Sequence, residues 1–106
     1  MDKKTPGKEV RAFVRKLRAE LHPEKIILFG SRAMGEAWKR SDYDFVIVSS
    51  DFEGMHWLER ISRVVRLWDN LSAIDALPYT PKEFAVKRKE SSVVRNAVRH
   101  GQLITD

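Results

Sequence analysis

The chain has 106 residues, so residues 1-106 are expected to form a single domain with a modest core. It has no cysteine, which excludes disulfide frameworks and thiolate metal sites, and no apolar run long enough to span a bilayer. Lys and Arg outnumber Asp and Glu by 20 to 15, and this excess favours an anionic partner. The start of the chain does not follow a signal-peptide pattern, so we expect a cytoplasmic protein without a membrane partner.

The first predicted helix begins at Thr5, with Pro6 at the first helical position, and ends near His22 and Pro23. Its apolar face is formed by residues at helical spacing: Val10, Phe13, Val14, Leu17 and Leu21. A basic stripe runs beside it: Lys8, Arg11, Arg15 and Arg18. The stripe is interpreted as a solvated face in preference to a partner or RNA surface.

Residues 26–29 are β-branched, aliphatic or aromatic and predict a short buried strand. The strand ends at Gly30 and Ser31, where good helix formers follow. Unpaired N–H groups at a helix start attract anions, and a glycine lets a phosphate approach closely. Gly30 and Ser31 are therefore predicted to bind phosphate, with Arg32 as a candidate for a further contact.

Residues 42–48 alternate in character, as a strand does when its two faces differ. This places Asp42 and Asp44 on one face and Tyr43 on the other. Two neighbouring carboxylates repel each other unless a cation lies between them. Oxygen ligands of this kind suit Mg²⁺ or Mn²⁺, which bind carboxylates, waters and substrate phosphates. The two motifs together predict a site for a metal ion and a nucleotide.

Gly30-Ser31, three residues, Gly35, and then Asp42-Tyr43-Asp44 resemble the signature of minimal nucleotidyltransferase domains in the polymerase-β-like superfamily. The resemblance covers nearly the whole chain, although Met34 stands where many members carry a basic residue. It implies a third carboxylate on a later strand, and residues 72–77 supply Asp75, before a turn at Pro78 and Pro81.

The resemblance also implies a function. It predicts transfer of NMP, with ATP as the expected NTP, to a hydroxyl group with the help of two Mg²⁺ ions held by Asp42, Asp44 and Asp75. Minimal nucleotidyltransferases of this type resemble antitoxins that add AMP to a tyrosine of a partner HEPN-domain toxin. The expected partners are therefore ATP and such a toxin.

The rest of the chain predicts three further helices. The first has an apolar side formed by Trp57, Leu58, Ile61, Val64, Val65 and Trp68. His56 before it stands alone, so it is interpreted as a surface or capping residue. The second begins at a capping box of Thr80, Pro81 and Glu83, with Phe84 inward. The third is capped by Ser91 or Ser92 and ends at His100 and Gly101. An edge strand is expected after it, at Leu103 and Ile104. The expected fold class is α/β: a small mixed β-sheet packed by helices, similar to the polymerase-β palm.

Two other interpretations stay open. The domain could be a binding module that holds nucleotide or masks a toxin without chemistry, although a pure binder has no need to gather carboxylates. It could also transfer NMP to a small hydroxylated molecule. No pattern of stacking aromatic residues favours nucleic acid as the main partner. The acceptor, the NTP preference and the oligomeric state, including a homo-oligomer, are left undetermined.

Overall fold

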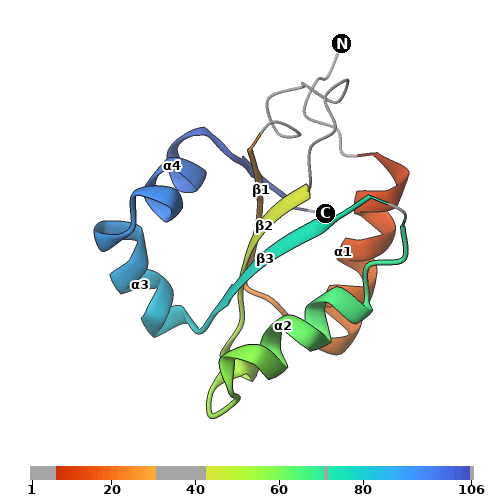
Figure 1. The fold of residues 1–106 in the computed structure, drawn as a ribbon, viewed down its shortest axis with the longest axis horizontal. Coiled ribbons are helices and arrows are strands. Elements are labelled where there is room, and N and C mark those ends of the chain that lie inside the picture. Colours follow the sequence, from red (N-terminus) through yellow and green to blue (C-terminus); the bar gives the residue numbers. More distant parts are fainter. Residues whose placement is uncertain (1–6, 31–42, 71, 106) are drawn as a thin grey trace.

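The computed structural model describes residues 7–30, 43–70 and 72–105, and within them it has four α-helices, one 3-10 helix and four strands (Figure 1). In chain order these elements are α1 (Lys8–Glu20), β1 (Lys25–Phe29), β2 (Tyr43–Val48), η1 (Ser50–Phe52), α2 (Trp57–Arg66), β3 (Ile74–Tyr79), α3 (Pro81–Glu90), α4 (Ser92–His100) and β4 (Gln102–Leu103). None of the described helices is long and apolar enough to cross a membrane.

The strands form one mixed sheet in the order β3-β2-β1-β4. β1 is antiparallel to both β2 and β4, whereas β2 and β3 are parallel. Parallel neighbours need a crossover connection, and α2 provides it. The predicted mixed sheet is confirmed, and the predicted edge strand near the end of the chain is found as β4.

Helices cover both faces of the sheet, with α1 and α2 on one face and α3 and α4 on the other (Figure 1). The alternation of β2 decides which side chain meets which layer. Phe45 and Ile47 pack with the residues of α1 and α2, whereas Val46 and Val48 pack against those of α3 and α4. The predicted alternation is therefore confirmed. Both faces of β2 are buried, so this strand lies in the centre of the core.

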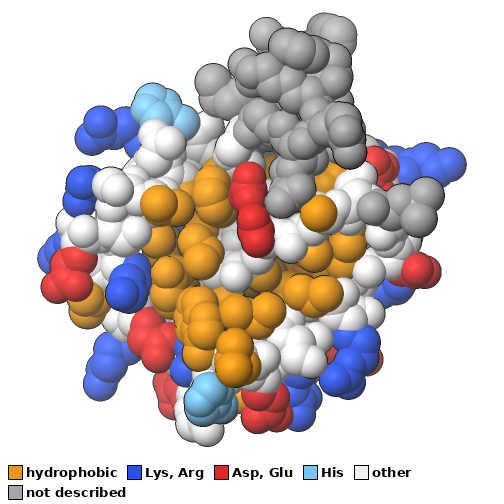
Figure 2. Space-filling model, in the orientation of Figure 1, with side chains coloured by type: hydrophobic (Ala, Val, Ile, Leu, Met, Phe, Trp, Pro, Cys, Tyr) orange, Lys and Arg blue, Asp and Glu red, His pale blue; other side chains and the backbone are white. Residues whose placement is uncertain are grey.

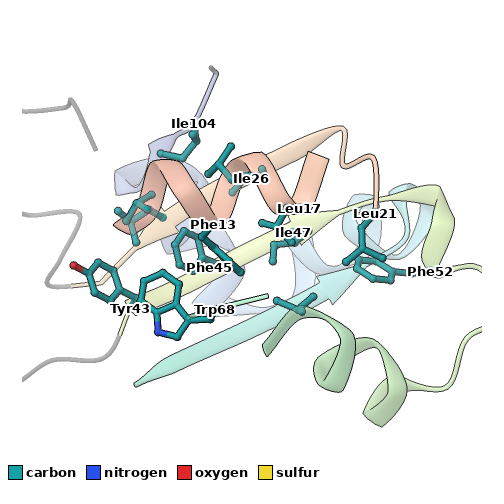
Figure 3. Packing of buried hydrophobic residues seen from close by; sticks show 14 residues of the cluster. Phe13, Leu17, Leu21, Ile26, Tyr43, Phe45, Ile47, Phe52, Trp68 and Ile104 are labelled. Carbon is teal, nitrogen blue, oxygen red and sulfur yellow. The ribbon is translucent and has the colours of Figure 1, made fainter. Parts of the chain in front are cut away.

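Aromatic rings fill the core between α1 and the sheet (Figure 3). The ring centroid of Phe13 lies 5.0 Å from that of Phe45 and 5.1 Å from that of Trp68, the second pair edge to face. Tyr43 is 4.8 Å from Trp68, and its hydroxyl donates to Glu9 Oε2 at 2.9 Å. These contacts fix the first residue of β2 from the α1 side.

The start of α1 differs from the prediction. The helix begins at Lys8, after an extended Gly7 that provides no side-chain hydrogen bond, so it starts later than predicted. Thr5 and Pro6 themselves lie outside the described residues. The five predicted core residues of this helix are all buried, and the basic stripe beside them is exposed.

The predicted apolar side of α2 is only partly correct. Leu58 and Val65 are exposed, at 67% and 39%, whereas Arg60 is 7% exposed. Its guanidinium donates to Glu83 Oε1 at 2.6 Å and to Glu83 Oε2 at 3.2 Å. It also donates to the carbonyls of Met55, at 2.9 Å, and Pro78, at 3.2 Å. Arg60 is buried because each side of its guanidinium has an acceptor, which helical periodicity cannot reveal.

Strand β3 runs through Pro78 to Tyr79, so the predicted turn at Pro78 is wrong. Proline lacks the N–H that an inner strand needs, but β3 lies at the edge of the sheet, where that loss is tolerated. The strand ends at Tyr79, and Thr80 caps the helix that follows. There the predicted capping box is confirmed, because Thr80 and Glu83 exchange hydrogen bonds between side chain and backbone.

Glu83 thus both caps α3 and pairs with Arg60. The hydrogen bond from Arg60 is the main reason that the pKa of Glu83 lies below its usual value, against a smaller opposing effect of burial. Burial, followed by the charge of Glu83, raises the pKa of Tyr79 above its usual value. At this end of the sheet, the hydrogen bonds of Arg60 to Glu83 and to the carbonyl of Pro78 link α2, β3 and α3.

Candidate functional site

Three side chains form a row across the sheet at the end where β1 finishes and β2 and β3 begin. Phe29 is paired with Asp44, and Asp44 is paired with Asp75. Directly paired residues on neighbouring strands point to the same face, and neighbouring strands lie about 4.8 Å apart. Two carboxylates separated by 31 positions in sequence therefore stand side by side on the face that carries α3 and α4.

Gly30 follows the end of this row. Its φ is +81°, a left-handed conformation that residues with side chains rarely adopt. A Cβ added there would collide with Oδ2 of Asp44. The backbone of Gly30 thus lies directly against the Asp44 carboxylate. The sequence predicts glycine here for the approach of a phosphate, and the structure adds that this carboxylate needs the same space.

The acidic pair lies at the surface. Asp44 is half-buried and Asp75 is exposed. Figure 2 shows acidic side chains near the centre of the view, with apolar side chains beside and below them. Charges of the same sign directly opposite each other on two strands destabilise a sheet. Their oxygens are also the ligands that Mg²⁺ and Mn²⁺ prefer. The donor set of this row therefore fits a hard divalent cation.

The remaining predicted site residues, Ser31, Arg32 and Asp42, lie outside the described residues. Within the part of the chain that is described, no group of three His, Cys, Asp or Glu gathers as a metal site. The structure therefore brings together Gly30, Asp44 and Asp75 of the predicted set.

His56 has no role in this site. It caps α2, where its Nδ1 accepts from the N–H of Leu58 at 3.2 Å, as its isolated position in the sequence predicted.

A cavity that the sequence did not indicate adjoins Gly30. It has a volume of about 310 Å³ and is lined by Phe29, Gly30, Asn96, His100 and Gly101. His100 and Gly101 were predicted only as the end of a helix. The sequence signal that could have indicated this cavity is the spacing of Asn96 and His100, which places both on one side of α4.

The comparisons with solved structures show a shared fold. BolA1 from Arabidopsis thaliana superposes with a TM-score of 0.60 and 25% identity, over 74% of this chain and 98% of that one. The BolA domain of SufE1 from the same plant gives 0.59 and 21%, over 74% and 99%. A candidate nucleotidyltransferase from Sulfolobus solfataricus gives 0.55 and 16%, over 96% of this chain and 90% of that one.

Curated protein sequences give no significant match. The decisive comparison is with protein-family models, because the family described as "Polymerase beta, Nucleotidyltransferase" matches residues 13–106. The match contains every predicted site residue. The mixed sheet agrees with the fold that the sequence resemblance implied. This chain therefore belongs to the polymerase beta nucleotidyltransferase family.

Proposed function

We propose that this nucleotidyltransferase domain transfers AMP from ATP to a hydroxyl group of a partner protein in a Mg²⁺-dependent reaction. The observation that carries the proposal is the pairing of Asp44 with Asp75, on the same face of neighbouring strands, beside a glycine that admits the Asp44 carboxylate. A domain that served only for binding would gain nothing from two repelling carboxylates in register.

Asp44 and Asp75, with Asp42, would hold two Mg²⁺ ions, and Mn²⁺ could replace them. When bound, the ions would neutralise negative charge on the triphosphate and on the departing pyrophosphate. Gly30 and Ser31 would bind the β and γ phosphates through their N–H groups, with Arg32 beside them. In the reaction, the acceptor oxygen forms a bond to the α phosphorus, the bond from that phosphorus to the bridging oxygen breaks, and the hydroxyl proton passes to water.

The fold supports this reaction by holding the carboxylates still. Asp44 follows Tyr43, which is fixed by Glu9 and by the ring of Trp68. Both neighbouring strands pair with β2 at Asp44. Little reorganisation is then needed when charge develops on the reacting phosphate, and preorganisation of this kind is a major source of catalysis.

For the acceptor we propose a tyrosine of a HEPN-domain toxin, as the sequence resemblance implies, so that the domain acts as an antitoxin. One surface supports a macromolecular partner. Helix α2 exposes Leu58 and Val65. Exposed apolar side chains on one helix are a common feature of protein interfaces.

The test is label transfer from ATP. The protein and its co-purifying or neighbouring-gene partner are incubated with Mg²⁺ and with ATP labelled at the α phosphate in one reaction and at the γ phosphate in another. We expect label on the partner from the α position only. Label from the γ position only would show phosphoryl transfer, and a partner that is bound but unlabelled from either would indicate a binding module.

Matched variants assign the transfer to the site. Asp44→Asn and Asp75→Asn keep the size of the side chain and remove one charge each. Asp51→Asn is the control, because Asp51 lies in η1, beyond the far end of β2, where it pairs with His22. Equal labelling by Asp44→Asn and the unaltered protein would exclude the proposed function.

A further inference from the structure

The cavity beside the acidic row provides a place for a second part of the substrate. Resting on the proposed function, we propose that it binds the nucleoside of ATP, its base and ribose, and that Asn96 and His100 recognise these groups. The cavity has a volume of about 310 Å³ and shares Gly30 with the predicted phosphate site. This volume is at the lower limit for ligand pockets, which suits part of a nucleotide.

The wall formed by α4 is held close to β1 by Gly101. A Cβ added to Gly101 would lie 2.8 Å from Ile27 Cγ2 and 2.9 Å from the carbonyl oxygen of Leu28. Only a glycine therefore allows the end of α4 to lie directly against the strand. Asn96 and His100 are one turn apart, beside the buried Ala97, so both are carried to the edge of the same cavity.

The chemistry of the lining favours a nucleoside over a phosphate. Among the described residues, neither lysine nor arginine lines the cavity, which lies at the C-terminal end of α4, where the helix dipole disfavours anions. The lining instead offers the ring of the half-buried Phe29, the amide of Asn96 and the imidazole of His100. A flat base can contact the ring, and hydrogen-bonding groups of base and ribose match the amide and imidazole.

The position of the cavity distinguishes the donor nucleoside from the acceptor. In the row across the sheet, Phe29 lies on β1 and Asp75 two strands away on β3. Adjacent strands are about 4.8 Å apart, which puts the Phe29 side of the row roughly 10 Å from the Asp75 side. We assign the acceptor hydroxyl to the Asp75 side, where the ion that activates this hydroxyl would be held. A nucleotide with its phosphates at Gly30 has its nucleoside within reach of the cavity.

The test separates nucleoside binding from phosphate binding by calorimetric titration of the full chain with Mg²⁺. One ligand is α,β-methylene ATP, which has both parts and cannot transfer AMP, and the other is inorganic triphosphate. The double variant Asn96→Ala/His100→Ala is compared with Val93→Ala, an exposed residue of the same helix that is not among those lining the cavity. We expect the double variant to weaken binding of the ATP analogue about tenfold, as the loss of two hydrogen bonds would, and to change triphosphate binding less than twofold.

Several results would overturn the proposal. An unchanged affinity of the double variant for the ATP analogue would show that the cavity is not used by the nucleoside. An equal loss of affinity for triphosphate would show that α4 acts on the phosphates. In the label-transfer assay, a raised KM for the acceptor with an unchanged affinity for the ATP analogue would assign the cavity to the acceptor. If the unaltered chain bound neither ligand, the proposed function would fail, and the nucleoside site with it.

Discussion

The two ends of the sheet differ in how a carboxylate is paired. At one end, Glu83 is held by the guanidinium of Arg60, which bonds to both carboxylate oxygens. At the other end, Asp44 is placed next to a second carboxylate, Asp75. The first arrangement joins three elements and has a structural purpose. The second places like charges opposite each other on two strands, an arrangement that suits the divalent cation proposed above.

The largest effect expected from this contrast concerns the acidic end. Asp44→Asn should lower AMP transfer by at least about 100-fold, because it removes a ligand of the proposed cation and negative charge from the proposed reacting centre. The variant should keep its fold, because asparagine has the size of aspartate and position 44 is only half-buried. Label transfer and thermal unfolding measure the two quantities. A large loss of stability would show that Asp44 has a structural role instead.

The reverse result is expected at the other end. Arg60→Ala should lower the free energy of unfolding by about 2–4 kcal/mol, because it leaves two carbonyls and a carboxylate without their shared donor. The value is reduced from that of a fully buried pair because the side chain of Glu83 is 43% exposed. Denaturant unfolding provides the measurement.

Arg63→Ala is the matched control on the same helix. Arg63 forms an exposed pair with Glu59 at 3.2 Å, and its loss should change the free energy of unfolding by less than about 0.5 kcal/mol. Similar losses in the two variants would mean that the buried position of Arg60 adds nothing to stability.

The burial of Arg60 could not be predicted from the sequence, although other features of the fold could. The presence of the strands, the alternation of β2 and the capping box at Thr80 follow from local patterns and were predicted, although β3 continues two residues beyond its predicted end. The burial of Arg60 depends on Glu83, 23 residues away, and on two carbonyls, so no local pattern indicates it. Apolar spacing placed Leu58 inside, but tertiary packing left that side exposed and buried a charged residue.

The site was predictable to a similar extent. The sequence supplied Gly30 and Asp44, because a strand, a turn and a second strand have clear signals. Asp75 was taken from the family resemblance, and only the register of β2 and β3 shows that it stands beside Asp44. The cavity at Asn96 and His100 depends on how α4 packs on β1, which a sequence pattern does not specify.

A third prediction tests the contact between Gly30 and Asp44. Gly30→Ala should lower the free energy of unfolding by about 1–2 kcal/mol because of its positive φ, and should reduce AMP transfer at least tenfold because Asp44 must move. Gly54→Ala is the control: its φ is +76°, but a Cβ there has no atom within 4 Å. It should be destabilised by about 1 kcal/mol and keep full transfer activity. Equal activity of the two variants would contradict the role of this contact.

The smallest predicted effect is the pH dependence of the structural end. Because the pKa of Glu83 is lowered in the folded protein, its contribution to stability is complete above its unfolded pKa, near 4.5, and is lost as the pH falls through the folded value. The pKa of Tyr79 is raised, so its contribution is present below the ordinary value of 10.0 and is lost as the pH rises through the folded value.

Melting temperatures of the unaltered protein and of Glu83→Gln, measured from acid to alkaline pH, separate the effect of Glu83 from that of Tyr79. The difference between the proteins should shrink as the pH falls below about 4.5. Above pH 10 the variant should retain most of the decline, since burial is the larger cause of the Tyr79 shift. A difference that stayed constant from neutral to acid pH would show that the Arg60 pair does not depend on the charge of Glu83.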